Sequence, residues 1–188
     1  DEAAILETDL DVTPIQIVEQ IAEHHPRIVG FSVYLWNVRI VESVARILRT
    51  VLPETRLIAG GPELTPEYAN VSLFDAVIIG EGETAFRNFC ARHLDGTPTG
   101  QLPLSDGSCF IAPPEPIDAL VLPFDEYSDT DLAQRTTYVE TSRGCPYSCV
   151  YCTSAKTKLR LFPLETLLPA LDRLWQRGKR QLKFLDRS

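Results

Sequence analysis

The sequence has 188 residues, of which 44% are hydrophobic and 23% charged, a composition typical of a folded globular protein rather than a disordered one. No apolar run approaches the roughly 20 residues that a membrane span requires, and the start does not resemble a signal segment, so we expect a cytoplasmic protein. The net charge of −8 divides unevenly, with 7 basic and 22 acidic residues in 1–134 but 11 and 4 in 135–188, and because the basic residues are scattered we expect no nucleic-acid partner.

The first part of the chain, residues 1–96, alternates helical patterns with short apolar runs. This rhythm is typical of a parallel sheet flanked by helices, so we predict an α/β, Rossmann-like domain. The expected strands cover residues 28–33, 57–59 and 76–79, and the expected helices begin at Pro14, at Asn37 and close to Glu83.

Two of these strands run out into glycine-rich loops, Gly60-Gly61-Pro62-Glu63 and Gly80-Glu81-Gly82-Glu83. Right-handed crossovers keep parallel strands pointing one way, so both loops should lie at the same edge of the sheet. Ligands of open sheets bind outside the carboxyl ends of the strands. Tight turns without a ligand would use the same glycines, and the pattern alone leaves both interpretations open.

The middle of the chain, residues 97–134, is rich in proline and is predicted to be a linker. Residues 135–188 then show a strand at 137–141, a loop at 142–158, a helix opened by Pro163 and a strand at 182–185. Strand, loop, helix and strand in this order predict the opening part of a TIM-like (β/α) barrel.

Three cysteines crowd into the predicted loop with the spacing CxxxCxxC, at Cys145, Cys149 and Cys152. Thiolates suit soft iron-sulfur centres, and three of them can hold three irons of a four-iron cluster while the fourth iron stays open. A zinc site with a fourth ligand from elsewhere is the alternative. Zinc loops usually pair a CxxC with a second pair, which this sequence lacks, so the pattern favours the cluster and a reducing compartment.

This loop resembles the signature of the radical S-adenosylmethionine (SAM) superfamily, with Tyr151 directly before the last cysteine. The resemblance implies a 4Fe-4S cluster on Cys145, Cys149 and Cys152 that chelates S-adenosylmethionine and cleaves it reductively to a 5'-deoxyadenosyl radical. It further implies an electron donor such as flavodoxin or ferredoxin. Tyr151 would lie near the adenine. Because the superfamily's usual Gly-Gly-Glu stretch is not visible, Asp186 is carried over as a cofactor contact.

The N-terminal part resembles the cobalamin-binding domain that precedes the barrel in one large class of these enzymes. The matching stretches are residues 30–37, 58–63 and 75–83. The resemblance implies methyl transfer by way of cobalamin, or oxidative cyclisation. No DxHxxG motif is present, so no histidine is in place to ligate cobalt, and a Rossmann-like domain that binds no cobalamin is the alternative. The residues that would face the corrin and its nucleotide tail are Ser32, Tyr34, Trp36, Gly60, Gly61, Gly80, Glu81 and Gly82.

The chain begins at Asp1 and contains no Met, so we expect a piece of a longer protein that lacks the first strand of its sheet and the later barrel strands. Open strand edges and uncovered apolar faces would leave this piece inactive and prone to self-association. The substrate, a small molecule or a peptide, is not predicted, because its contacts would come mostly from later barrel loops.

Overall fold

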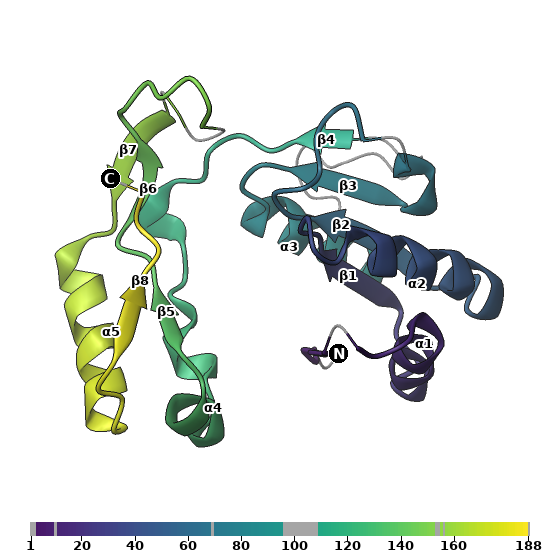
Figure 1. Ribbon diagram of the computed structural model, residues 1–188, viewed down its shortest axis with the longest axis horizontal. Helices are drawn as coiled ribbons and strands as arrows, with labels where there is room; N and C mark the ends of the chain where they lie inside the picture. The colour runs from purple at the N-terminus through teal and green to yellow at the C-terminus, as the bar shows by residue number, and fades with distance from the viewer. Residues whose placement is uncertain are drawn as a thin grey trace. The chain divides into compact units, whose positions relative to one another are not determined.

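The computed structural model describes residues 3–9, 11–68, 70–95, 109–152, 155 and 157–187. The chain divides into two compact units, Asp1–Pro114 and Glu115–Ser188 (Figure 1). Among the described residues, no helix combines the length and the apolar character that crossing a bilayer requires.

The first unit is built on a four-stranded parallel sheet in the order β1-β2-β3-β4. Its strands and helices confirm the α/β, Rossmann-like class predicted from the sequence. In chain order the elements are α1 (Pro14–Glu23), β1 (Ile28–Ser32), α2 (Val38–Val51), β2 (Arg56–Gly60), the 3-10 helix η1 (Val71–Leu73), β3 (Ala76–Ile79), α3 (Glu83–Asp95) and β4 (Cys109–Ile111).

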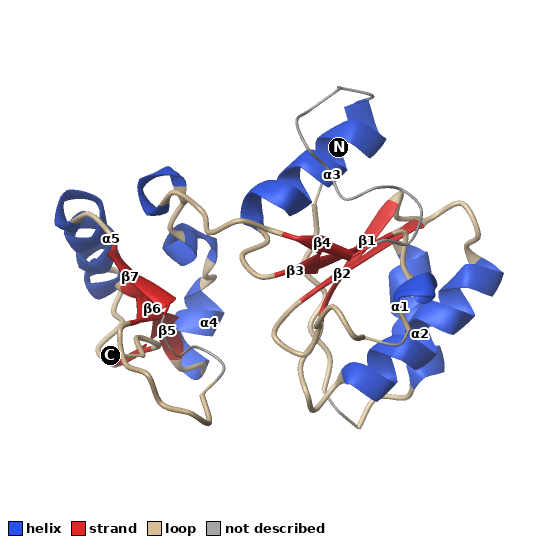
Figure 2. Cartoon of the chain, turned by 90° about the horizontal axis from the view of Figure 1, so that it is seen from above, coloured by secondary structure: helices blue, strands red, loops and turns tan. Residues whose placement is uncertain are grey.

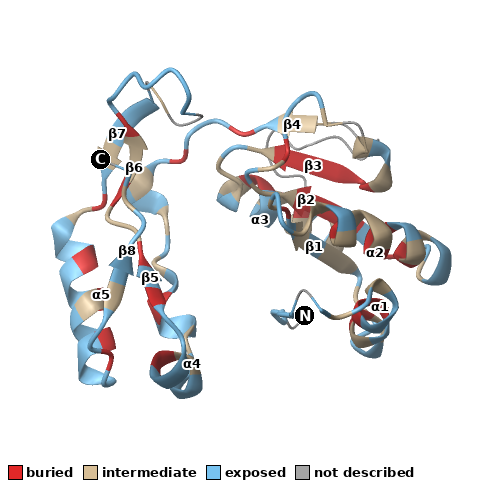
Figure 3. Cartoon of the chain, in the orientation of Figure 1, coloured by how far each residue is buried: buried red, intermediate tan, exposed pale blue. Residues whose placement is uncertain are grey.

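Helices cover both faces of this sheet, α1 and α2 on one side and α3 on the other (Figure 2). Side chains alternate between the faces along each strand, so Leu57 packs in the core under α1 and α2 while its neighbour Ile58 packs in the core that contains Phe89 of α3. The central strands β2 and β3 are accordingly the most buried part of the unit (Figure 3).

The start of α1 follows from its sequence. The Thr13 hydroxyl accepts a hydrogen bond from the Gln16 amide at 3.4 Å, and the Gln16 side chain accepts one from the Thr13 amide at 3.0 Å. This reciprocal capping box satisfies amides that the first turn would leave unpaired, and Pro14 needs no such partner.

Asp75, just before β3, fastens the amino end of the sheet. Its side chain is 9% exposed. One carboxylate oxygen forms an ion pair of 2.9 Å with Arg56 of β2, and the other forms one of 2.9 Å with Arg49 of α2 and accepts the Leu57 amide at 2.8 Å. Burial alone would raise the pKa of Asp75, but the Leu57 amide and the two guanidinium groups outweigh burial and hold this pKa below its usual value.

Strand β4 lies inside the range 97–134 that the sequence predicts as a linker. Its three residues pair with β3, with Cys109 opposite Val77 and Ile111 opposite Ile79. The prolines that follow, beginning at Pro113, keep the strand short, because proline cannot donate to a strand ladder. The proline-rich range therefore supplies a short edge strand to the first unit.

The second unit contains two small sheets and one long helix. β5 pairs with β8 in parallel, and β6 and β7 form an antiparallel hairpin. In the chain, α5 follows β7 and leads into β8. The barrel itself stays a prediction. The elements are η2 (Ile117–Ala119), η3 (Pro123–Glu126), α4 (Asp129–Gln134), β5 (Thr137–Val139), β6 (Ser142–Cys145), β7 (Thr157–Leu161), α5 (Leu164–Gln176) and β8 (Leu182–Phe184).

The core of the second unit lies between α5, η3 and the β5–β8 pair, where Val139, Leu167 and Leu174 are buried together with Phe124 and Leu132 (Figure 3). The hairpin differs from the sequence prediction, which treated residues 142–158 as a loop. β6 carries no apolar alternation, and in β7 the alternating leucines Leu159 and Leu161 are both exposed. The hairpin pairs polar residues such as Arg143 opposite Arg160.

Candidate cofactor sites

The residues predicted to face cobalamin follow the carboxyl ends of three neighbouring strands. β1 ends at Ser32, β2 at Gly60 and β3 at Ile79, and the parallel register places Ser32 opposite Gly60 and Gly60 opposite Ile78. The topology therefore brings these residues to one edge of the sheet, the usual ligand position in such folds. The loops that leave this edge carry Ser32, Tyr34 and Trp36, then Gly60 and Gly61, then Gly80, Glu81 and Gly82.

Asn37 holds the first of these loops. Its side-chain oxygen accepts the Tyr34 amide at 2.7 Å, and its side-chain nitrogen donates to the Ser32 carbonyl at 2.9 Å. The sequence predicts that the following helix begins at Asn37, with this residue in the cap position. It does occupy that position, but its side chain makes no bond to the helix because both polar atoms are used by the loop. Its role in ordering the loop was not predicted.

Tyr34 and Trp36 form an aromatic pair on this loop. Their rings are stacked, with centroids 4.5 Å apart and planes 11° from parallel. Trp36 is nevertheless 65% exposed. Stacked rings with one exposed face at the carboxyl ends of the strands offer a broad, rigid apolar surface of the kind that binds large planar ligands.

The two adjacent glycines at the end of β2 have different surroundings. Gly61 has φ of +123°, and a Cβ there would lie 2.4 Å from the Val33 carbonyl oxygen, so the fold itself requires glycine. Among the residues that the structure describes, a Cβ on Gly60 would meet nothing closer than the Ile78 carbonyl oxygen, at 3.8 Å. None of these residues therefore fills the space beside Gly60.

This difference gives a matched pair of stability predictions. Gly61→Ala is expected to lower the free energy of unfolding by about 2–4 kcal/mol, because it combines an unfavourable φ with a backbone clash. Gly60→Ala is expected to change it by less than about 0.5 kcal/mol. Urea denaturation followed by circular dichroism measures both. Equal losses in the two variants would contradict the assignment of a structural role to Gly61 alone.

The three histidines lie away from this edge. His24 and His25 come directly before β1, and Arg27 donates to the His93 carbonyl oxygen at 3.1 Å, next to the start of the same strand. All three are thus at the amino end of the sheet.

The cysteine segment begins at the end of β6. Cys145 is 7% exposed, its amide donates to the Thr157 hydroxyl at 2.9 Å, and its thiol donates to the Arg187 carbonyl oxygen at 3.5 Å. Cys149 and Cys152 are exposed and share one turn, in which the Cys152 amide donates to the Cys149 carbonyl oxygen at 3.2 Å.

The structure does not gather the three thiols. Within the described part of the chain, no three His, Cys, Asp or Glu side chains lie close enough to share a metal ion. The donor set nevertheless fits an iron-sulfur cluster chemically, because it offers three thiolates, two of them exposed on one turn. Tyr151, predicted to lie near the adenine, is on the same turn and 88% exposed.

Gly144 shapes the hairpin directly before Cys145. Its φ is +95°, and a Cβ there would be only 2.2 Å from the Lys158 carbonyl oxygen on the facing strand. The strand register shifts between Arg143 and Cys145, which is the signature of a β-bulge. Glycine at this position therefore sets the direction in which the first cysteine leaves the hairpin.

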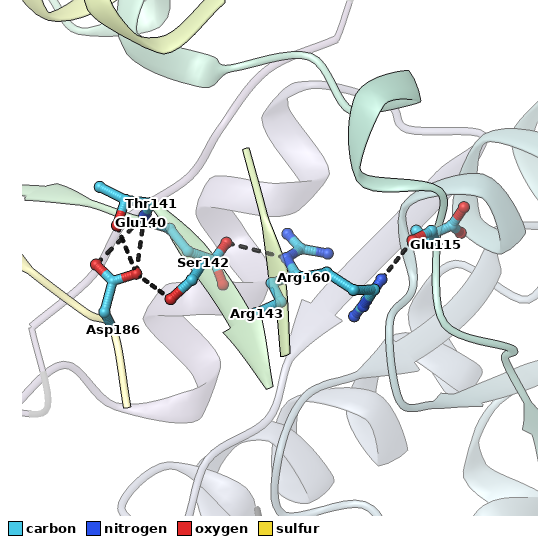
Figure 4. Close-up of polar contacts among 7 residues, drawn as sticks. All are labelled: Glu115, Glu140, Thr141, Ser142, Arg143, Arg160 and Asp186. Atoms are coloured by element: carbon cyan, nitrogen blue, oxygen red, sulfur yellow. Dashed lines mark hydrogen bonds and ion pairs between the residues drawn. The ribbon is translucent and has the colours of Figure 1, made fainter. Parts of the chain in front are cut away.

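Asp186, predicted as a cofactor contact, accepts hydrogen bonds from Thr141 and Ser142 of the same chain (Figure 4). One oxygen accepts the Thr141 amide at 3.1 Å, the Thr141 hydroxyl at 2.8 Å and the Ser142 hydroxyl. Burial alone would raise the pKa of Asp186, but these hydrogen bonds outweigh burial and hold this pKa below its usual value. Close by, Arg143 pairs with Glu140 at 3.0 Å and Arg160 donates to the Glu115 carbonyl oxygen.

The parallel sheet with its open carboxyl edge and the hairpin with three cysteines define a two-unit α/β protein with two candidate cofactor sites. Residues 2–90 match the family model described as the B12 binding domain, so this part of the chain is similar to that family.

Several relatives match both units. The chain is 30% identical to a 2-(S-pantetheinyl)-carbapenam-3-carboxylate methyltransferase of Streptantibioticus cattleyicolor, over 78% of this chain and 25% of that protein. It is 29% identical to an uncharacterized methyltransferase of Pyrococcus horikoshii, over 94% and 43% of the two chains. It is also 29% identical to a cobalamin-dependent radical SAM methyltransferase of Streptomyces tokunonensis, over 86% and 27%.

These similarities confirm the resemblance drawn from the sequence motifs, to radical SAM enzymes that carry an N-terminal cobalamin-binding domain. The chain spans less than half the length of each of these three relatives.

Proposed function

We propose that this chain is the cofactor-binding part of a cobalamin-dependent radical SAM enzyme that transfers methyl groups. The observation that carries the proposal is the stacked Tyr34–Trp36 pair, with Trp36 exposed, together with the space at Gly60, both at the carboxyl ends of the strands of a domain similar to the B12-binding family. The names of the relatives, which are methyltransferases, support the reaction class.

In this proposal the first unit holds the corrin without a protein ligand to cobalt. The aromatic pair would supply an apolar surface for the ring, and exposed Ser32, the last residue of β1, would offer a hydroxyl at the same strand end. The glycine loop of Gly80, Glu81 and Gly82 would face the same ligand. Bound cobalamin supplies a methyl carrier, and the chain's residues bind and orient it.

In the second unit, Cys145, Cys149 and Cys152 would hold a 4Fe-4S cluster. Such a cluster supplies the electron for reductive cleavage of S-adenosylmethionine, and an external donor such as flavodoxin or ferredoxin would replace that electron. The chain itself would contribute three thiolates, and Gly144 sets the direction in which the first of these cysteines leaves the hairpin. This oxygen-sensitive chemistry fits a cytoplasmic, reducing location.

A zinc-stabilised binding module is the second candidate, and the exposed Cys149–Cys152 turn favours it, because a CxxC turn is also a zinc-binding element. Metal analysis separates the two. After anaerobic treatment with iron and sulfide, the enzyme proposal expects a brown protein with about four irons per chain. A colourless protein that keeps one zinc would reject the enzyme proposal and support the module.

A further inference from the structure

Two consecutive residues after β8 contact the two ends of β6. Asp186 accepts hydrogen bonds at the start of β6, from the Ser142 hydroxyl and from Thr141 just before it. At the end of β6, the backbone carbonyl oxygen of Arg187 accepts a hydrogen bond from the Cys145 thiol. A four-residue strand is thus held at both ends by residues more than 40 positions away.

Asp186 also joins two sheets that share no strand pairing. Before it, the Leu185 amide donates to the Val139 carbonyl oxygen at 2.9 Å, which extends the parallel pairing of β5 with β8 beyond the strands themselves. The carboxylate then bonds to Thr141 and Ser142, which lead into the β6–β7 hairpin. The position of β8 is therefore transmitted to the hairpin that carries the first cysteine.

The carboxylate is poorly suited to bind a cofactor directly. A carboxylate oxygen has about two lone pairs, and the first oxygen of Asp186 already accepts three hydrogen bonds from Thr141 and Ser142. Its second oxygen lies 3.3 Å from the Thr141 amide. These hydrogen bonds satisfy the carboxylate of Asp186 without any ligand.

We propose that Asp186 is a positioning residue, which sets β6 and so fixes the Cys145 thiol in its buried place, rather than a contact to S-adenosylmethionine. The inference rests on the proposed function in one respect, namely that Cys145 is a cluster ligand. The positioning itself is a property of the chain and can be measured without iron.

The test measures how fast each cysteine reacts with iodoacetamide in the metal-free chain, with the modified sites mapped by mass spectrometry. In the wild type, exposed Cys149 and Cys152 should react quickly and buried Cys145 slowly. Asp186→Ala is expected to raise the Cys145 rate by roughly tenfold or more, because burial limits access to the thiol, and to change the Cys149 rate by less than about twofold.

Two variants keep this test specific. Asp186→Asn retains a carbonyl oxygen that can accept from Thr141 and Ser142, so it should keep Cys145 slow. Asp131 is a matched control in the same unit, because its carboxylate likewise accepts an amide, at 3.0 Å, and a hydroxyl, both from Ser128, yet it lies at the start of α4. Asp131→Ala should leave the Cys145 rate unchanged.

An unchanged Cys145 rate in Asp186→Ala would overturn the proposal, and so would an equal rise in Asp131→Ala, which would indicate general loosening of the unit. If Asp186→Ala does not fold, a Cys145 rate in Asp186→Asn as fast as that of Cys149 would also overturn it, and a slow rate would support it. Iron analysis of the wild type is a separate measurement. A wild type without iron but with the expected reactivities would reject the cluster and keep the positioning role.

Discussion

Replacing Cys149 by alanine is expected to abolish iron retention by the chain. The wild type, reconstituted anaerobically and desalted, should hold about four irons per chain, and Cys149→Ala less than about one. The reason is that the two remaining thiolates would leave two of the four irons without a protein ligand. Iron is counted by colorimetric assay, and loss of the brown colour gives the same answer by absorbance.

Cys90→Ala is the matched control, because it also removes one thiol but from α3 of the first unit, where the half-buried side chain has no predicted metal role. Its iron content should equal that of the wild type. Unchanged iron in Cys149→Ala would remove this residue from the ligand set. An equal loss in Cys90→Ala would show that the iron is bound without regard to the cysteine hairpin.

Asp75→Ala is expected to lower the free energy of unfolding of the first unit by roughly 2–4 kcal/mol. The change removes a buried carboxylate that Arg49, Arg56 and the Leu57 amide all use, and leaves that amide without its side-chain partner. The exposed parts of the two arginines return to water, which keeps the loss below that of a fully buried pair. Urea denaturation followed by circular dichroism gives the value.

Glu67→Ala, which removes a negative charge from an exposed position of the same unit, is the control and should change stability little. The pH dependence has a defined sign. Because the pKa of Asp75 is lower in the folded state, its stabilisation is present above the unfolded pKa of about 4 and is lost as pH falls through the lower folded pKa. Asp75→Ala should lack this part of the acid sensitivity. Equal urea midpoints for Asp75→Ala and Glu67→Ala would contradict the account.

The elements that the sequence predicted best are those whose signals are local. Pro14 marks the start of α1 as predicted, and the structure adds a capping box between Thr13 and Gln16. β2 and β3 are short apolar runs that end on glycine, and both lie in the buried centre of the sheet. Their direction and common edge follow from the chirality of parallel connections.

The features that the sequence did not predict depend on distant or purely polar partners. Nothing near Asp186 in the chain indicates that Thr141 will use its carboxylate, because 45 residues separate them. The hairpin of β6 and β7 was missed because β6 has no apolar alternation and that of β7 is confined to Leu159 and Leu161. Asn37 has the residue type of a helix cap, but only the folded loop shows that its carboxamide bonds to Tyr34 and Ser32 instead.

In the candidate sites, too, local sequence signals were predictive and distant contacts were not. Motif spacing was enough to select the three cysteines and the loops at the carboxyl edge, and the parallel sheet brings those loops to one edge. Spacing could not distinguish Gly61, which the fold requires, from Gly60, beside which space remains. That distinction makes Gly60 the position at which a ligand can be tested without disturbing the protein.

The most direct test of the central claim, that the first unit binds cobalamin at this edge, is the amount of hydroxocobalamin retained through a desalting column. The wild type should retain about one cobalamin per chain, as expected for one site at the strand ends, and Gly60→Val less than about a tenth of that. Circular dichroism should show both folded, since a Cβ at Gly60 meets no atom closer than 3.8 Å. Passage of the wild type through the column free of cobalamin, or equal retention by Gly60→Val, would contradict the claim.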